Sequence, residues 1–395
     1  MKKGQAAAAI CLIILAFLWA AQPVLAEEEP GLEQREIAEY QLDKLGLEDI
    51  HQFWEEISQD YGAFLPESQK GSLLEFVKGE KTFSPKEWGY AFLNFLFHEL
   101  IANGKLLGTL ILLSIFSTML RALQNAFEHD AVSRVAYSIT FIVLIVIALN
   151  SFYVAMIYVQ ESVSNMVHFM IALFPLLMAL LASMGAVTTV ALFHPLIMFL
   201  VNTSGLMIQY FVLPLLFFSA LLSIVSSLSE YIQVTKLATL LRSIALWALG
   251  VFLTIFLGVI SVQGATAAVT DGVAVKTAKF IAGNFVPVVG RVFTDAADTV
   301  MGASLLLKNT VGMAGVAVLF MICAFPAIKV LSIALIFHAA AAVLQPLGAG
   351  ELLEALSTLG RTVLYMFAAL AIVGLMFFLA ITMVVASGNL SLMVR

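Results

Sequence analysis

Long apolar runs separated by short polar connections dominate the chain from residue 104 onward. Runs of this length can cross the ~30 Å hydrocarbon core of a bilayer as α-helices. They are residues 104–121, 135–159, 166–185, 188–204, 206–228, 243–262, 311–328, 330–347 and 362–386. The connections within 166–204 and 311–347 are very short, so either pair could instead be a re-entrant hairpin. We therefore expect about seven to nine spans.

The segment from Glu27 to Leu100 has a different pattern, in which apolar residues recur at rough helical spacing among acidic residues. Its sharpest signal is the run from Phe83 to Trp88, where Ser84 fits an N-cap, Pro85 the first helical position and Glu87 a capping box. A helix should begin at Pro85 and lie at the membrane surface before the first span. The segment is either a docking module or only an acidic cap.

Residues 1–26 have the pattern of a signal peptide. Two lysines precede an apolar run, and small residues occupy the positions that a signal peptidase accepts before Glu27. The run is shorter than the ~20 residues a span needs, which favours cleavage after Ala26 over an uncleaved first span. Cleavage would place the mature N-terminus outside the cytoplasm.

Composition supports a membrane protein. The 395 residues are 61% hydrophobic and 12% charged, with a mean hydropathy of +1.00, whereas soluble domains have about 25% charged residues. The formal net charge of −6 argues against nucleic-acid binding. Residues 27–100 carry 17 acidic and 6 basic side chains, whereas Val135 to Thr235 contains no Lys or Arg and only two acids, Glu161 and Glu230. We place Glu161 in a short exterior turn.

Basic residues indicate the orientation of the spans. If the N-terminal segment is outside, alternate crossings place the residues from Arg121 to Arg134, then Lys236 and Arg242, then Lys329, on the cytoplasmic side. This agrees with the positive-inside rule. The stretch 263–310 is the exception, because basic residues there would lie outside beside balancing acids, unless one earlier span is a hairpin.

Residues 263–310 form an unusual stretch, apolar but interrupted by glycines and a proline. The sequence from Gly283 to Gly290, which includes Asn284 and Pro287, predicts a break between two amphipathic helices. Their charged stripes would consist of Lys276, Lys279, Arg291, Asp295 and Asp298. Such a hairpin suits either the membrane surface or the lining of an aqueous passage.

Prolines inside apolar runs predict helix kinks at Pro175, Pro195 and Pro214. The surroundings of Pro175 and Pro214 resemble each other weakly, which is either a chance match of leucine-rich runs or an internal repeat. Paired broken helices mark substrate sites in many transporters. An autonomous small-molecule transporter with a midplane site at these broken helices is therefore the alternative function.

Catalytic chemistry finds no support in the sequence. There is no P-loop, no metalloprotease His-Glu-x-x-His pattern and no nucleophile elbow, and Asp295 and Asp298 lack a third ligand for a metal. Cys11 and Cys323 lie in apolar runs and cannot build a disulfide framework. We expect neither an enzyme nor a resident cofactor or metal.

The sequence thus predicts an all-α, polytopic helical membrane protein with broken and amphipathic helices and a small N-terminal helical extracytoplasmic segment. The expected parts are a signal peptide (1–26), the acidic segment (27–100), a first transmembrane bundle (101–262), the broken amphipathic hairpin (263–310) and a second group of spans (311–395).

The stretch from Asp271 to Phe280, together with that from Asn284 to Arg291, closely resembles the stage III sporulation protein AE family of endospore-forming Firmicutes. The resemblance extends to the signal peptide, the length, and the proline-containing runs at Phe174-Pro175 and His194-Pro195. It carries no catalytic residues over to this chain.

The resemblance implies a multi-pass protein made in the mother cell and placed in the outer forespore membrane. There it would be part of the stage III A to Q complex, a secretion or feeding channel that sustains late forespore gene expression. The implied partners are other stage III sporulation A proteins, including a separate ATPase and ring-forming proteins, and the forespore Q protein. A purely structural scaffold remains a third possibility.

Overall fold

The computed structural model describes residues 48–66, 85–126, 131–228, 233–285, 289–347 and 350–393. Within these residues the chain is helical and has no strand. The predicted signal peptide (1–26) and most of the predicted acidic segment (27–100) lie outside the described residues. The helices are α3 (Glu48–Tyr61), α5 (Pro85–Ala102), α6 (Gly104–Ala126), α7 (Ala131–Ser183), α8 (Val187–Met207), the π-helix η2 (Ile208–Val212), α9 (Leu213–Leu228), α10 (Thr235–Phe285), α11 (Val289–Leu344), the short 3₁₀-helix η3 (Gln345–Leu347) and α12 (Gly350–Met393).

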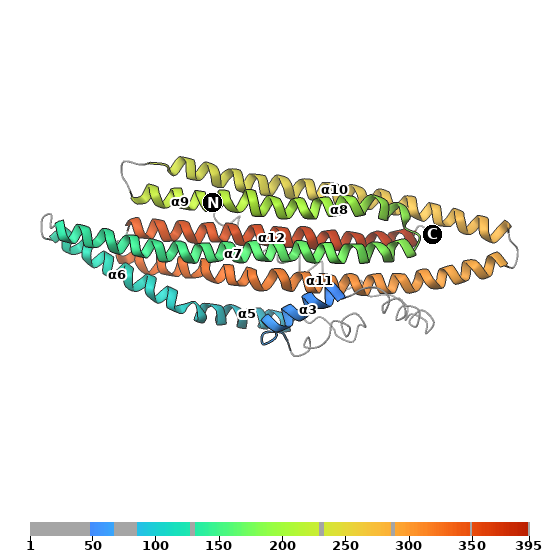
Figure 1. Ribbon diagram of the computed structural model, residues 1–395, viewed down its shortest axis with the longest axis horizontal. Coiled ribbons are helices and arrows are strands. Elements are labelled where there is room, and N and C mark those ends of the chain that lie inside the picture. Colours follow the sequence, from blue (N-terminus) through green and yellow to red (C-terminus); the bar gives the residue numbers. More distant parts are fainter. Residues whose placement is uncertain are drawn as a thin grey trace.

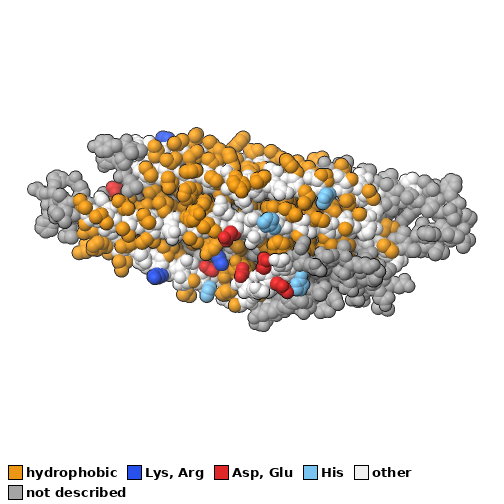
Figure 2. Space-filling view, viewed as in Figure 1, with side chains coloured by type: hydrophobic (Ala, Val, Ile, Leu, Met, Phe, Trp, Pro, Cys, Tyr) orange, Lys and Arg blue, Asp and Glu red, His pale blue; other side chains and the backbone are white. Residues whose placement is uncertain are grey.

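The long helices run side by side in an elongated bundle (Figure 1). α12 and α7 lie in its middle, with α8, α9 and α10 on one side and α11, α6 and α5 on the other. α3 lies across α11 and α7 about half-way along the bundle. Most of the visible surface is apolar, and charged side chains gather near its middle (Figure 2). An apolar outer surface is what a lipid solvent allows.

Helix length is the main departure from the predicted spans. The nine apolar runs fall into fewer, longer helices: 135–159 and 166–185 are both part of α7, and 311–328 and 330–347 belong to α11 and the turn that follows it. Five helices of the described residues are long and apolar enough to cross a membrane, or six when the bent α5–α6 pair is counted. α7 has 53 residues. At 1.5 Å per residue it is about 80 Å long, more than twice a hydrocarbon core.

The predicted hairpin at 166–204 and the predicted hairpin at 311–347 have different outcomes. The first is a pair of antiparallel helices, because α7 ends at Ser183 and α8 starts at Val187. Gly185 has φ 81° there, and the N–H of Ala186 bonds to the carbonyl of Leu181 in a Schellman motif. The second prediction is wrong, because α11 continues through 328–330 without a turn.

The α5 helix begins at Pro85, as the proline and its flanking residues predict. It buries Trp88 and Phe95 against the bundle and leaves Tyr90 and Phe97 exposed. A bend of 45° at Asn103 then separates α5 from α6. Asn103 stabilises this bend, because its side-chain amide donates to the carbonyl of Glu99 at 2.9 Å.

Candidate functional site

A cluster of aromatic and charged side chains joins α3 and α5 to the middle of the bundle. The ring of Tyr61, the last residue of α3, stacks on Phe325 of α11 with 4.3 Å between centroids. The Lys329 ammonium, one turn further along α11, lies 5.1 Å from the Tyr61 ring and 5.4 Å from the Tyr158 ring of α7. A cation between two aromatic faces is attracted to both. These contacts hold the C-terminal end of α3 about half-way along the bundle.

The second wall of this junction is aromatic as well. Phe95 of α5 contacts Phe325 edge to face at 5.1 Å and Tyr61 at 5.7 Å. Phe64, just beyond α3, packs on Phe95 and on His98. Edge-to-face pairs of this kind add about 0.5–1.5 kcal/mol each beyond the area they bury. The N-terminal helices therefore dock on the bundle mainly through rings.

Acidic residues surround the junction. The pKa of the Tyr61 hydroxyl is raised to about 12, mainly by burial and also by the nearby carboxylates of Asp60, Glu99 and Glu161. Glu161 was expected in an exterior turn, but it lies within α7 and is exposed on the helix surface. The helix continues because Ser162 turns inward and donates to the carbonyl of Ile322 on α11 at 3.0 Å. Glu161 therefore places a charged side chain half-way along α7 without interrupting the helix.

Further polar side chains lie about half-way along the bundle, on α7 and η2. Gln209 of η2 donates to the carbonyl of Gln160 on α7 at 3.5 Å, and Tyr210 beside it is exposed. On α7, Asn165 and His168 follow Glu161 at one-turn spacing and are exposed too. Polar groups thus occur on neighbouring helices about half-way along their length.

Asp271 is a buried carboxylate near the far end of α10. Its two oxygens accept hydrogen bonds from the backbone N–H groups of Thr188 and Thr189, at 3.0 Å and 2.8 Å. These donors belong to the first turn of α8, whose own N-cap residue, Ala186, supplies no side-chain bond. A residue of one helix thus caps another, with a negative charge at the positive end of the helix dipole.

Lys308 is a second buried charge among the described residues. Its side chain is fully buried between α11 and α12 and donates to the carbonyl of Val385 at 2.8 Å. Nearby, the Ser183 hydroxyl of α7 donates to that of Ser304 on α11 at 3.1 Å. The interior of this half is therefore partly polar.

The predicted amphipathic hairpin at 263–310 is the far end of α10 and α11 and not a separate element. Its expected boundaries, 262/263 and 310/311, fall inside α10 and α11, which run on to the tip of the bundle beyond α7, α8 and α12 (Figure 1). α10 ends at Phe285 and α11 starts at Val289, so the break between the two helices falls where the Gly283–Gly290 pattern predicts it.

The charged stripe of this hairpin is described only in part. Lys276 is exposed on α10. Gly283 and Asn284 lie in the last turn of α10 and Gly290 in the first turn of α11, while Pro287 is outside the described residues. The side chains that lie outside the description are those of Lys279, Arg291, Asp295 and Asp298. Whether they form one stripe stays a prediction.

The predicted kink residues are accommodated in different ways. α7 and α8 continue through Pro175 and Pro195. Pro214 is the second residue of α9, just beyond η2, and a widened π-turn is a way to accommodate a residue that lacks an N–H donor. Sequence reasoning missed Pro326, which lies inside α11 next to Phe325.

In the described part of the chain, no group of three His, Cys, Asp or Glu side chains could hold a metal ion. The sequence reasoning also missed the roles of Tyr61 and Lys329. Their only signal was a lysine inside an apolar run and a tyrosine at the end of an amphipathic helix, and neither pattern indicates that the two meet.

These features define an all-α, multi-pass membrane protein with docked N-terminal helices. The chain belongs to the stage III sporulation protein AE family, whose model matches residues 68–388. It is 60% identical over 370 residues to the stage III sporulation protein AE of Bacillus subtilis (strain 168), an alignment that covers 94% of this chain and 92% of that relative. No solved structure matches the chain. The protein is thus a sporulation protein of the membrane.

Proposed function

We propose that the chain is an integral membrane component of the channel or secretion complex that joins the mother cell to the forespore, the stage III A to Q complex. In this role it supports late forespore gene expression during endospore formation. The observation that carries the proposal is the 60% identity to a sporulation protein over nearly the whole chain, in a protein built as an apolar bundle.

The proposed partners supply what this chain lacks. The sequence has no P-loop, so ATP-driven work would come from the separate ATPase of the complex. Ring-forming stage III A proteins and the forespore Q protein would contact the exterior side. The chain would reside in the outer forespore membrane, with the cytoplasmic ends of its helices facing the interior of the mother cell.

The length of α6 supports a position for the membrane. α6 has 23 residues, about 35 Å, and runs from near the middle of the bundle to one end of it (Figure 1). A bilayer around this half would have the docked α3 and α5 at its outer surface and Lys236 and Arg242 at its cytoplasmic side. Lys329 would then lie at the outer surface beside Tyr61, and not on the cytoplasmic side as the alternate crossings predicted.

The other half of the bundle would then project outward from the membrane. α3 supports this placement, because it exposes Gln52, Glu55 and Glu56, which hydrocarbon would not accept. The projecting half ends in the 263–310 hairpin, placed toward the second membrane and the ring-forming partners. Exposed apolar residues on α8, such as Phe199 and Leu206, would be covered there by partner chains.

Complementation of a deletion strain tests the proposal. The wild-type chain should restore a late forespore reporter, whereas a variant with Lys276→Gln, Lys279→Gln, Asp295→Asn and Asp298→Asn should reach the membrane but restore little. Glu354→Gln, an exposed acid at the opposite end, is the control and should behave as wild type. Full activity of the fourfold variant would favour a purely structural scaffold.

Reconstitution separates the proposal from the transporter alternative. The purified chain alone in vesicles should move no small solutes, and activity should need the partner membrane proteins. Solute transport by the chain alone would overturn the channel-component assignment. The continuous α7 helix around Pro175 gives no unwound backbone for a substrate there.

A further inference from the structure

Two arginines approach each other within the apolar, membrane-facing half of the bundle. Arg242 of α10 lies over the Tyr365 ring of α12, and Arg361 is one turn before Tyr365 on α12, so the two positive charges lie near each other. Among the described residues, no carboxylate lies within salt-bridge distance of either guanidinium group. Arg242 is half-buried and Arg361 is exposed, and two like charges at the edge of an apolar bundle are costly unless an anion joins them.

The guanidinium groups are held by uncharged partners. Arg242 lies over the Tyr365 ring of α12 at 6.0 Å and donates to the Ser223 hydroxyl of α9 at 3.5 Å. Its Nε atom is buried and has no hydrogen-bond partner. Arg361 turns back toward the cytoplasmic end, donating to the Ser357 carbonyl at 3.2 Å. Two helices, α10 and α12, therefore present guanidinium donors without an acceptor of matching charge.

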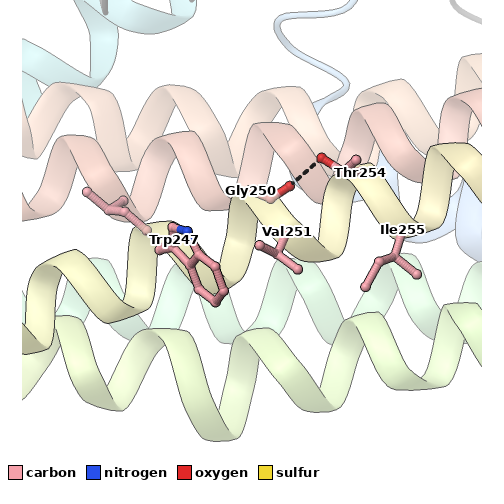
Figure 3. Close-up of a pocket in the computed structure, with 6 residues that line it drawn as sticks. Trp247, Gly250, Val251, Thr254 and Ile255 are labelled. Carbon is pink, nitrogen blue, oxygen red and sulfur yellow. Dashed lines mark hydrogen bonds between the residues drawn. The ribbon is translucent and has the colours of Figure 1, made fainter.

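An apolar groove starts one turn beyond Arg242 on the same helix. It is lined by Leu246, Trp247, Gly250, Val251, Thr254 and Ile255 (Figure 3). A side chain at Gly250 would meet nothing within 4 Å, so the surface is open there. The Thr254 hydroxyl is turned back onto the Gly250 carbonyl at 2.9 Å and offers the groove little polarity. Trp247 and Ile255 are exposed beside it.

We propose that Arg242 and Arg361 bind the phosphate of an anionic phospholipid whose acyl chain lies in the groove beside Trp247. Arg is well suited to this task, since its planar fork matches phosphate oxygens. The groove extends from Leu246 to Ile255, about 14 Å of helix, which matches a large part of an acyl chain. The basic pair at one end and the apolar groove beyond it select a lipid over a free phosphate ion. Basic pockets between spans on the cytoplasmic side bind such headgroups.

Quenching of Trp247 fluorescence tests the site in the purified full chain in nanodiscs. Phosphatidylglycerol with brominated acyl chains should quench emission at least twofold more than brominated phosphatidylcholine at equal mole fraction. Trp247→Phe should remove the difference, because Trp54 and Trp88 lie on α3 and α5, away from the groove. Arg242→Gln and Arg361→Gln should each abolish the preference, whereas Lys276→Gln, the same charge change at the far end of α10, should preserve it.

Lysine variants keep the test valid if a glutamine variant does not fold. Arg242→Lys and Arg361→Lys retain the charge and should keep part of the preference for phosphatidylglycerol. Equal quenching by the two lipids, or a preference that survives Arg242→Gln and Arg361→Gln in folded protein, would overturn the proposal. Complete displacement by inorganic phosphate would also overturn it, since it would show a free-anion site. The readout does not depend on the proposed role in sporulation.

Discussion

The carboxylate of Asp271 on α10 accepts a hydrogen bond from the backbone N–H of Thr189 on α8 at 2.8 Å. The same carboxylate also accepts from Thr188, so one side chain satisfies two of the N–H groups that a helix N-terminus leaves open. Asp271 belongs to the stretch that carries the family resemblance. It ties the projecting end of α10 to the turn between α7 and α8.

Replacing Asp271 by Ala should destabilise the protein. Loss of an N-cap typically costs about 0.5–2 kcal/mol, and here the freed N–H groups are buried. Thermal unfolding of the purified chain in detergent, followed by circular dichroism, measures the effect. Asp271→Asn keeps one acceptor and should have an intermediate midpoint.

Lys276→Gln is the matched control for this prediction. Lys276 lies on the same helix, little more than one turn away, and is exposed. Its variant should unfold at the wild-type midpoint. An Asp271→Ala midpoint equal to that of Lys276→Gln would show that the cap contributes nothing to stability.

Gly374 allows close contact between α12 and α11. A Cβ atom at this position would lie 2.6 Å from the Sγ atom of Cys323. Small residues let helices approach closely in membrane bundles. Gly374→Leu should therefore force the two helices apart and cost about 1–3 kcal/mol, as overpacking does.

The same unfolding measurement tests this prediction, with Gly258→Leu as the control. A side chain at Gly258 on α10 would meet nothing within 4 Å, and leucine is the better helix former. The control should be neutral or slightly stabilising. If both leucine variants unfold alike, the α11–α12 contact is looser than described.

The apolar runs predicted the fold class, because a chain with so few charges can only be solvated by lipid. They also predicted particular ends: Pro85 starts α5, and the change from α10 to α11 falls inside 283–290. These signals are local. Proline and glycine limit the backbone at their own position, so a sequence pattern is enough to locate them.

The joining of the runs into long helices could not be predicted in the same way. Gln160, Glu161 and Ser162 look like a polar connection, but an α-helix accepts them because Glu161 points outward and Ser162 bonds to α11. The tertiary cap by Asp271 and the burial of Lys308 depend on contacts between residues far apart in sequence. Periodicity along one helix carries no information about such partners.

Tyr61 should make the docking of α3 sensitive to alkaline pH. Its pKa is raised from 10.0 to about 12, chiefly by burial, so the docked state favours the neutral phenol. The stabilisation is complete below pH 10 and is lost as the pH rises from 10 toward 12. Absorbance at 295 nm should show a tyrosine titrating near pH 12 that is missing in Tyr61→Phe.

Limited proteolysis connects this titration to structure. Cleavage next to α3 should increase above pH 10 in the wild-type protein. The Tyr61→Phe variant keeps the ring that stacks on Phe325 and should resist cleavage across the same range. Equal alkaline sensitivity in both proteins would assign the release of α3 to another group.

Cysteine labelling along α7 should locate the edge of the bilayer proposed above. Ile139 and Val146 are exposed on the half that would lie in lipid, and Asn165 and His168 are exposed beyond the mid-length level. A membrane-impermeant maleimide added from outside should label Asn165→Cys and His168→Cys but neither Ile139→Cys nor Val146→Cys. The reason is that thiols in hydrocarbon neither ionise nor meet the reagent.

The experiment uses cells that express the chain without its partners, where nothing else covers the projecting half. Labelling after detergent solubilisation checks that each cysteine is reachable. Labelling of Val146→Cys in intact membranes, or protection of His168→Cys, would place the membrane elsewhere along the bundle.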